Sequence, residues 1–433
     1  MKKRIALAAA LGVLAASPAF ASGYRIPEQS INSTALANAS VAYTPNADAS
    51  YYNPANMSWL DKAAQAEASL TWIQLTSIDY TDSAVASRNG SSKDEDFVLP
   101  NLHLVSPYYG NNWRFGLSVI YPYGLSKQWP SGFARTSAEE FTLRTYEINP
   151  TVSYKVNDKF SLGGGVRVIY SEGKVKSNGS VPATSVGGST VYSTIARDMD
   201  GDTTEYGYNL AATFRPVENL SFAATYRSKV DLDIDGDAVL SASQGFLATG
   251  TPVPALAAAA YSGGASVSVP APAVLSLAVS YTCNNGKTTA EFAYDQTYWD
   301  AYEQLDFNYA SALSNPVLIA AFDNAKPKNW DNSDAFRIGL SHKLTDQWTI
   351  MAGFAIDRNP VPDRTLGFEL PDSDAKIYSC GVRYQATPNL NLGAAYLFDD
   401  KESRTVSTNL NSVNGTFEDA GAHLLTAGLQ YRF

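Results

Sequence analysis

Few side chains in this chain of 433 residues are suited to covalent or metal-assisted chemistry. Its three histidines are His103, His342 and His423, and no neighbouring segment offers a serine to pair with them. His342 shares the phase of Phe336 and Leu340, which points away from any polar interior. The sequence lacks metal-ligand clusters, phosphate-binding loops and nucleotide motifs. We therefore expect no enzymatic activity, no metal and no cofactor.

The overall charge narrows the choice of partner. The chain has 32 lysines and arginines against 42 acidic residues, which gives a formal charge of −10. Nucleic acid binding needs a basic face that neutralises phosphates. We therefore exclude nucleic acid as a partner.

The first 21 residues have the three parts of a secretory signal peptide. Lys2, Lys3 and Arg4 give a positive start, and an apolar run follows them. Ala19 and Ala21 then occupy the small-x-small positions of a cleavage site. We expect cleavage after Ala21 and export of the chain. No later apolar run is long enough for a membrane helix.

The two cysteines, Cys283 and Cys380, are widely separated in the sequence. An oxidising compartment permits a disulfide between exported cysteines, but two single thiols do not imply one. Whether they interact stays open at the level of sequence.

The chain after residue 63 alternates apolar and polar side chains with a period of two. In the last segment, Leu425, Leu429, Tyr431 and Phe433 are apolar, and polar or small residues stand between them. A strand with this pattern has one apolar and one polar face. Fourteen such segments can be counted between residues 64 and 433.

Short and long connections alternate between these segments. Turns such as 156–159 are short, connections such as 178–203 and 238–266 are long, and Asn285-Gly286 is a tight-hairpin signal. This asymmetry, the even strand count and the aromatics near strand ends predict an all-β fold, a 14-stranded antiparallel outer-membrane β-barrel. The sheet must close because lipid offers no hydrogen bonds. A large soluble β-protein would explain the alternation but not the asymmetry.

Such a barrel places the protein in the bacterial outer membrane as an integral, multi-pass protein. We expect contact with outer membrane lipids, a monomeric state, and recognition of the strand ending in Phe433 by the barrel-assembly machinery. The polar faces then line the lumen, where charges of both signs are expected to pair with one another. The charges concerned are Arg167, Arg227, Glu291, Asp295, Arg337, Arg383 and Arg432.

Residues 22–63 do not follow the barrel pattern and are rich in Ala, Asn and Ser. Asn53 suits a helix cap, and Pro54 suits the first helical position, where no N–H is needed. So short a segment lacks a good core of its own, and a fourteen-stranded lumen is wide enough to need filling. We therefore divide the chain into a signal peptide (1–21), an N-terminal hatch or plug (22–63) and the barrel (64–433).

The third strand contains a second anomaly. Pro122 and Gly124 fall in mid-strand, where proline cannot donate to the ladder and glycine weakens it. One interpretation places them beyond the membrane, where pairing no longer matters. The other is a break that leaves a lateral gap in the wall, framed by Tyr121, Pro122, Tyr123, Gly124 and Leu125.

The chain resembles the FadL family of outer-membrane transporters for long-chain fatty acids and other hydrophobic compounds, which includes an aromatic-hydrocarbon branch. The resemblance covers essentially the whole mature chain. Its specific parts are the hatch motif Asn53-Pro54-Ala55, the Tyr-Gly-Leu of the third strand, and residues 336–374. It implies a fourteen-stranded barrel plugged by a small, mostly helical hatch, with a third strand that kinks inward.

The resemblance also implies a passive route for a hydrophobic ligand. Extracellular loops capture it, an inner pocket binds it against the N-terminus of the hatch, and it leaves sideways through the gap. Tyr24 and Ile26 are then expected at the inner pocket. Phe246, Leu247 and Leu256 are expected in the loop groove, since they lie in the longest apolar stretch after the signal peptide. A loop helix packed on its neighbours is the alternative for that stretch.

The position that would hold a substrate carboxylate departs from the family's pattern. Fatty-acid members place basic residues there, and this chain has Ser177 at one such position, with Lys174 and Lys176 nearby as candidate ligand-binding residues. At the other position it has Asp306, which would repel a carboxylate. Long-chain fatty acids are the substrate that the family implies, and neutral monoaromatic hydrocarbons are an alternative by the same route. A general porin is a more distant alternative.

Overall fold

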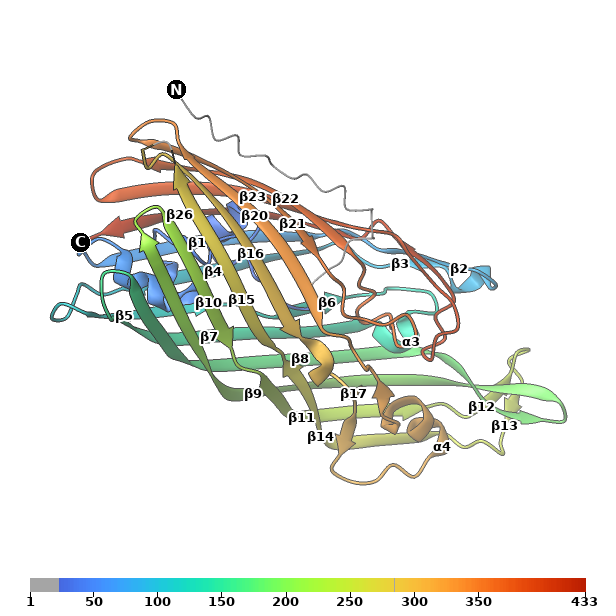
Figure 1. The fold of residues 1–433 in the computed structure, drawn as a ribbon. Coiled ribbons are helices and arrows are strands. Elements are labelled where there is room, and N and C mark those ends of the chain that lie inside the picture. Colours follow the sequence, from blue (N-terminus) through green and yellow to red (C-terminus); the bar gives the residue numbers. More distant parts are fainter. Residues whose placement is uncertain (1–22, 284) are drawn as a thin grey trace.

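A computed structural model describes residues 23–283 and 285–433, and its main sheet is antiparallel and closes on itself. β1 (Gln65–Leu75) hydrogen-bonds to β4 (Glu95–Val105) on one side and to β26 (Gly421–Arg432) on the other. The predicted fourteen-stranded barrel is confirmed (Figure 1). The predicted signal peptide, residues 1–21, lies outside the described residues. Within the described ranges, no helix is both long and apolar enough to cross a membrane.

The fourteen barrel strands comprise seventeen segments, because the third, seventh and eighth strands are each interrupted. The third consists of β5 (Trp113–Ile120) and β6 (Gly124–Lys127), the seventh of β10 (Leu220–Arg227) and β11 (Val230–Ala242), and the eighth of β14 (Ala259–Ala271) and β15 (Ala273–Cys283). The remaining strands are β7 (Glu140–Lys155), β8 (Phe160–Val186), β9 (Ser189–Val217), β16 (Thr288–Tyr298), β20 (Ser333–Lys343), β21 (Trp348–Asp357), β22 (Ala375–Gln385) and β23 (Leu390–Lys401). Each barrel strand pairs with the next along the chain, so the wall follows sequence order.

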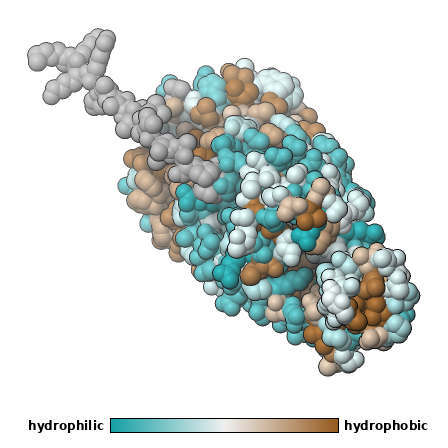
Figure 2. Space-filling view, turned by 90° about the vertical axis from the view of Figure 1, so that its right-hand side faces the viewer, coloured by the Kyte–Doolittle hydropathy of each residue, from teal (hydrophilic) through white to brown (hydrophobic). Residues whose placement is uncertain are grey.

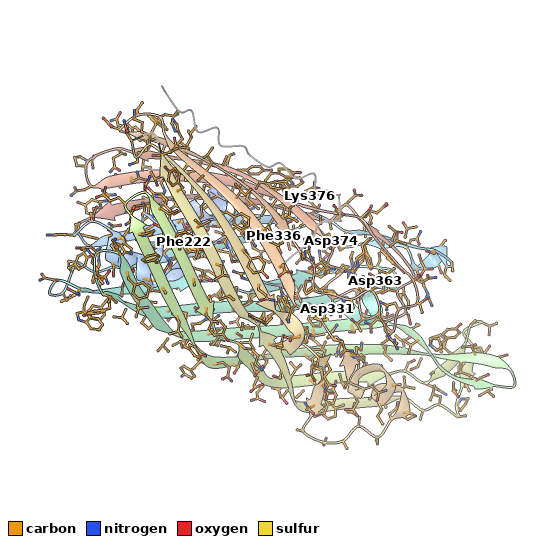
Figure 3. All side chains as sticks on the ribbon, viewed as in Figure 1. Phe222, Asp331, Phe336, Asp363, Asp374 and Lys376 are labelled. Carbon is orange, nitrogen blue, oxygen red and sulfur yellow. The ribbon has the colours of Figure 1, made fainter. Side chains whose placement is uncertain are left out.

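The period-two pattern sorts side chains between lipid and lumen. On β26, Leu425 is 48% exposed, whereas its neighbour Thr426 is fully buried. Phe336 is exposed on the barrel wall in the same way (Figure 3). Cys380 is also exposed, and both it and Cys283 are free thiols. Apolar side chains therefore face lipid while polar ones face the interior.

Connections at one end of the barrel are short, and those at the other end carry most of the remaining elements. These loop-end elements are β2 (Asp79–Asp82), η2 (Ala86–Arg88), β3 (Gly90–Ser91), α3 (Arg135–Ala138), β12 (Gly245–Leu247), β13 (Pro252–Val253), η3 (Trp299–Ala301), β17 (Gln304–Leu305), β18 (Phe307–Tyr309), α4 (Pro316–Leu318), η4 (Ile319–Asp323), β19 (Lys326–Pro327), β24 (Arg404–Val406) and β25 (Gly415–Glu418). Asp331, Asp363 and Asp374 lie toward this end (Figure 3). Figure 2 looks onto it and shows a mostly hydrophilic face with an apolar patch on a projecting lobe.

The longest hairpin differs from its sequence-based prediction. The sequence predicts a long connection at 178–203, but β8 and β9 run through it as one continuous hairpin. The chain turns at Gly187 and Gly188, whose φ angles of 56° and 82° suit glycine. Small and polar residues replace large apolar ones here, so the alternation is too weak to mark the strands. The connection at 238–266 is likewise shortened, because β11 and β14 extend into it.

The segment before β1 lies inside the barrel and contains α1 (Ile31–Ala35), α2 (Ala49–Tyr52) and η1 (Pro54–Trp59) (Figure 1). Asn53 caps η1 by accepting a hydrogen bond from the main-chain nitrogen of Ala55, and Pro54 takes the first helical position, as the sequence predicts. The side-chain amide of Asn53 also donates to Thr213 of β9 at 2.9 Å. Helices this short are marginal alone, so the wall stabilises them.

The lumen charges pair with one another as the sequence predicts, with the exception of Glu291. Glu291 accepts hydrogen bonds from the main-chain N–H groups of Val41, Ala42 and Tyr43 in the plug. Pairing matters because an uncompensated buried charge is strongly destabilising. The ion pairs are Arg167–Glu147, Arg227–Glu147, Arg337–Asp295, Arg337–Asp357, Arg383–Glu67 and Arg432–Asp61.

Gly163 of β8 marks a close approach of the plug to the wall. A Cβ at this position would lie 2.4 Å from the main-chain nitrogen of Ala55. We expect Gly163→Ala to displace the plug, because a backbone cannot yield as a flexible side chain would. The single-channel conductance in planar bilayers should then rise several-fold. Gly264→Ala is the control, since its nearest atom would be 3.5 Å away; equal conductance in both variants would contradict the close approach.

Candidate functional site

The third barrel strand is interrupted at residues 121–123, which we call the strand break. β5 ends at Ile120, and β6 begins at Gly124. β4 pairs with β5 only through its residues 102–105, so residues 95–101 have no ladder partner on that side among the described strands. A proline that cannot donate and a strand without a neighbour together interrupt the wall.

The N-terminal segment, residues 23–29, pairs with the strand break through its main chain. The main-chain nitrogen of Ile26 donates to the carbonyl oxygen of Pro122 at 2.9 Å. The main-chain nitrogen of Gly124 donates in turn to the carbonyl oxygen of Tyr24 at 2.9 Å. An antiparallel bridge lies between these two bonds. Main-chain groups at the break are therefore paired by the plug, as a wall in lipid requires.

A cavity of about 530 Å³ lies beside the break, and we call it the strand-break cavity. That volume is in the range of small-molecule sites, so the cavity has room for a ligand. The predicted gap residues Tyr121, Tyr123, Gly124 and Leu125 line it, together with Ile26, Phe97 and Leu99.

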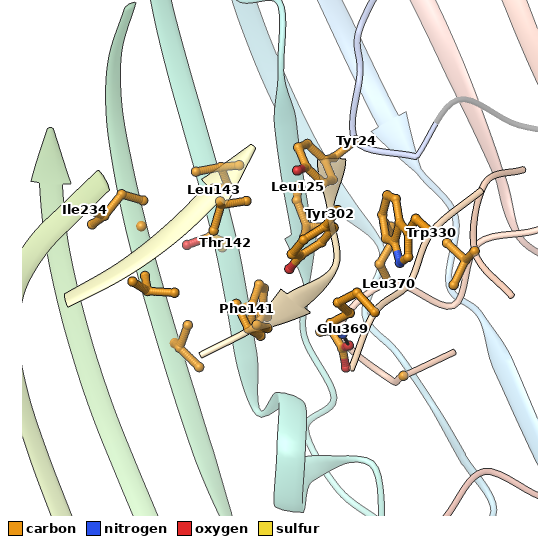
Figure 4. A pocket seen from close by; sticks show the side chains of 18 of the residues that line it. Tyr24, Leu125, Phe141, Thr142, Leu143, Ile234, Tyr302, Trp330, Glu369 and Leu370 are labelled. Carbon is orange, nitrogen blue, oxygen red and sulfur yellow. Dashed lines mark hydrogen bonds and ion pairs between the residues drawn. The ribbon is translucent and has the colours of Figure 1, made fainter. Parts of the chain in front are cut away.

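Tyr24 is the centre of a buried aromatic cluster. The centroid of its ring lies 4.6 Å from that of Trp299 and 5.7 Å from that of Trp330. Tyr302 is a third neighbour, at 6.2 Å. The Tyr24 hydroxyl donates to the carbonyl oxygen of Pro270 at 2.5 Å. Edge-to-face contacts of this kind contribute beyond burial alone, so one side chain fixes the N-terminal segment (Figure 4).

A second cavity of about 50 Å³ lies against the Tyr24 ring, and we call it the aromatic cavity (Figure 4). Three leucines line both cavities, so the two adjoin at these side chains. A site for a small molecule usually needs about 300–1,000 Å³. The aromatic cavity therefore cannot hold a long ligand until Tyr24 moves. The shared leucines are Leu125, Leu143 and Leu370.

The polar groups around the aromatic cavity carry an excess of positive charge. Lys328 and Glu369, both in its lining, form an ion pair. Burial by itself would raise the pKa of Glu369, but the ammonium of Lys328 lowers it below the ordinary value. Lys326 forms no ion pair among the described residues. Burial and the nearby charge of Arg197 lower its pKa to about 8, although Glu369, already paired with Lys328, attracts it as well.

Arg197 on β9 is a buried guanidinium without an acidic partner in the described part of the chain. It donates to the hydroxyl of Ser177, its direct partner across the β8–β9 ladder, at 3.0 Å. The rings of Phe307 and Phe322 lie 5.0 and 5.1 Å from it, and its Nε has no hydrogen-bond partner within the described ranges. Sequence reasoning missed Arg197, because only the strand register reveals that it faces Ser177. A buried charge is normally paired, so an anionic ligand could satisfy it.

The lysines predicted beside the ligand lie elsewhere. Lys174 and Lys176 are on the outside of the β8–β9 hairpin, where they pair with Glu140 and Asp198. Inward positions on β8 are odd-numbered, such as Val175 at 7% exposure, so the even-numbered lysines fall on the opposite face. The structure brings neither lysine to a cavity.

The predicted inner residues are divided between the two cavities. Tyr24 lines the aromatic cavity, and Ile26 lines the strand-break cavity. Asp306 is half-buried and lines neither. Its neighbours Leu305 and Phe307 both line the aromatic cavity, so the alternation of the chain turns Asp306 away from it.

The predicted groove residues belong to the projecting loop end. Phe246 and Leu247 lie in β12, which pairs with β9, and the Phe246 ring is 6.2 Å from that of Tyr192. Leu256 packs against the buried core. Residues 245–264 form strands and turns, so the alternative of a loop helix is wrong.

The chain is similar to known outer-membrane proteins over most of its length. The profile of the family described as "Outer membrane protein transport protein (OMPP1/FadL/TodX)" matches residues 12–433. The long-chain fatty acid transport protein of Escherichia coli K12 is 24% identical over 363 residues, which cover 77% of each chain. A FadL homologue of Pseudomonas aeruginosa has the same fold, with a TM-score of 0.80 and 21% identity over 95% of this chain and 100% of its own. The toluene transporter TodX of P. putida gives a TM-score of 0.71 and 18% identity over 93% and 98%.

Replacing Tyr24 with alanine should enlarge the aromatic cavity and expose the tryptophans behind it, because its ring lines the cavity and packs against both. Trp299 and Trp330 are now 0% and 5% exposed, and their fluorescence should become more accessible to the quencher acrylamide. Tyr24→Phe keeps the ring and loses only the hydrogen bond to Pro270, so its quenching should stay close to that of the parent. Equal quenching in Tyr24→Ala and the parent would show that Tyr24 does not shield the two tryptophans.

Proposed function

The chain belongs to the outer membrane protein transport family of FadL and TodX, and on that premise we propose that it carries long-chain fatty acids into the cell by passive diffusion. Membership makes it an outer-membrane transporter of hydrophobic compounds and not an enzyme. One observation carries the fatty-acid proposal. Arg197 and Lys326 lie next to residues that line the aromatic cavity and form no ion pair among the described residues, and the one acid that attracts them, Glu369, is paired with Lys328.

A carboxylate would satisfy charges that the protein leaves unpaired. Lys328, Lys326 and Arg197 share one acid, Glu369, which pairs with Lys328, so a net positive charge remains available to a ligand. A fatty acid could place its head beside them and its chain along the apolar wall that includes Phe307. A hydrocarbon would leave both charges without a partner, at the cost that attends any isolated buried charge.

The two cavities suggest a route. The ligand first meets the loop end, where Phe246, Leu247 and Leu256 offer apolar surface. It enters the aromatic cavity, which enlarges as Tyr24 and the N-terminal segment shift. Because the cavities share three leucines, the same shift opens a path to the strand-break cavity. The ligand then leaves sideways at the strand break, and apolar burial favours each stage over water.

In this proposal, residues 22–63 act as the hatch that closes the barrel of residues 64–433, after removal of residues 1–21. The protein acts as a monomer. Phe433 is available to the barrel-assembly machinery: its main-chain nitrogen donates to the carbonyl oxygen of Ala64 at 3.0 Å, while the residue is 74% exposed.

Neutral monoaromatic hydrocarbons are the second candidate substrate. The observation in their favour is the lining of the aromatic cavity, where Tyr24, Tyr302 and Trp330 offer ring faces and edges. A general porin fits less well, because the plug is buried against the wall and fills the lumen that a porin needs open.

Restoring the third strand should block the exit. Pro122→Val returns an N–H to the main chain, and Gly124→Val adds a side chain where a Cβ would lie 2.8 Å from Ile26. We expect the double variant to assemble as a heat-modifiable barrel and to lose most uptake of labelled oleate. Pro150→Val, within β7, is the matched control and should transport like the parent. Full uptake by the double variant would remove lateral exit from the proposal.

Arg197→Met keeps the length of the side chain and removes its charge. Oleate binding should weaken about ten- to hundredfold, because a hydrogen bond to a charged group contributes about 1.5–3 kcal/mol. Toluene binding should be unchanged. Lys176→Met, at an exposed pair on the outside, is the control. Equal losses for both ligands would make Arg197 a structural residue, and undiminished oleate binding would favour the hydrocarbon candidate.

A further inference from the structure

The side chain of Gln29 bonds both to the strand break and to the N-terminal segment. It is fully buried at the end of the N-terminal segment. Its side-chain Oε1 accepts a hydrogen bond from the main-chain nitrogen of Tyr121 at 2.9 Å, and its Nε2 donates to the carbonyl oxygen of Tyr121 at 2.9 Å. The same Nε2 donates to the carbonyl oxygen of Ile26 at 2.9 Å. One side chain therefore serves both the first residue of the strand break and the N-terminal segment.

Gln29 makes with Tyr121 the pair of hydrogen bonds that a neighbouring strand would make. In an antiparallel ladder, one residue exchanges both its N–H and its C=O with its partner. The Gln29 amide supplies this pair of bonds from a side chain, at the point where the β5 ladder ends. A neutral amide is the side-chain group that offers a donor and an acceptor together in one plane. Leucine would offer neither, and a carboxylate would offer no donor.

The backbone of Gln29 is tied to the plug and to the wall. Its N–H donates to the hydroxyl of Tyr52 in α2 at 2.7 Å. Its carbonyl oxygen lies 2.8 Å from Nε2 of His103 on β4. Since a carbonyl can only accept, the proton of the neutral ring is on that nitrogen. His103 Nδ1 is then free to accept from the hydroxyl of Ser118 at 3.1 Å.

The contacts on the two sides of Gln29 differ in kind. Immediately after it, Ser30 and Ser33 form a capping box, and the Ser30 hydroxyl donates to Asp48 at 2.8 Å. These bonds fix the chain inside the plug. Before Gln29, the segment meets the strand break through the main-chain bonds of Tyr24 and Ile26. Gln29 therefore stands at the boundary between a fixed part and a part that can swing away.

We propose that Gln29 is the positioning residue of the gate: its amide holds the edge of the strand break at Tyr121 in place while the segment before it moves. The proposal rests on lateral exit at the strand break. When residues 23–26 withdraw, the bonds to Pro122 and Gly124 are lost, but those to Tyr121 remain. The opening is thereby confined to residues 122–124, and the wall formed by β5 and its partner β4 stays closed.

Hydrogen exchange of the purified full chain tests this role without a ligand. In Gln29→Leu, the main-chain groups of Tyr121 lose their partners, and exchange in the peptide covering 118–124 should speed up about tenfold or more. Ligand release should also become faster, because the bond from Nε2 to Ile26 is lost. The matched control is Gln430→Leu, which removes a buried glutamine that binds Asn46 of the plug far from the break.

A second variant separates positioning from general loss of packing. In Gln29→Glu at about pH 8, the carboxylate still accepts from Tyr121 but cannot donate; protonation at about pH 5 restores one donor. Protection of 118–124 should return in part at the lower pH, and only in this variant. Unchanged exchange in Gln29→Leu, or an equal rise in Gln430→Leu, would overturn the proposal. Unchanged uptake in Pro122→Val with Gly124→Val would instead refute lateral exit and leave the exchange result standing.

Discussion

A sheet in lipid cannot leave its backbone groups unpaired, and this constraint governs the whole molecule. The barrel meets it by joining β1 to β26. At the strand break the ladder fails, because Pro122 has no N–H to donate, and the N-terminal segment supplies the missing partners. A wall completed by another strand could open only by unravelling the sheet. In the proposed route, the plug segment bonded to the strand break can withdraw while the sheet stays intact.

The pairing of buried charges explains where the plug is held to the wall. Arg337 and Arg383 lie in the lumen with acidic partners, and both also bond to groups of the plug. Arg197 and Lys326 are different, because they form no ion pair among the described residues and the acid nearest to them, Glu369, is paired with Lys328. Paired charges specify one arrangement of plug and wall. An excess of positive charge is what the proposed carboxylate ligand would compensate.

Local patterns predicted the barrel, the Asn53 cap and the break at Pro122, because each depends on neighbours in the sequence. The position of the proposed ligand-binding charge, Arg197, depends instead on the register between β8 and β9. Proximity in sequence to Ser177 suggested Lys174 and Lys176, but the period of two puts them on the outer face. Arg197, twenty residues from Ser177, faces it only because β8 and β9 pair as one long hairpin. The weak alternation past residue 178 concealed that pairing.

The closed aromatic cavity bears on the choice of substrate. In the proposed route, an entering ligand displaces Tyr24, which loses its contacts with Trp299 and Trp330 and its bond to Pro270. Burial of each methylene group contributes about 0.8 kcal/mol toward that cost. A long acyl chain gains many such increments, whereas a single ring gains few. A small hydrocarbon would therefore gain less toward displacing Tyr24. In the proposed route, a cavity closed by Tyr24 selects for the length of the ligand as well as for its charge.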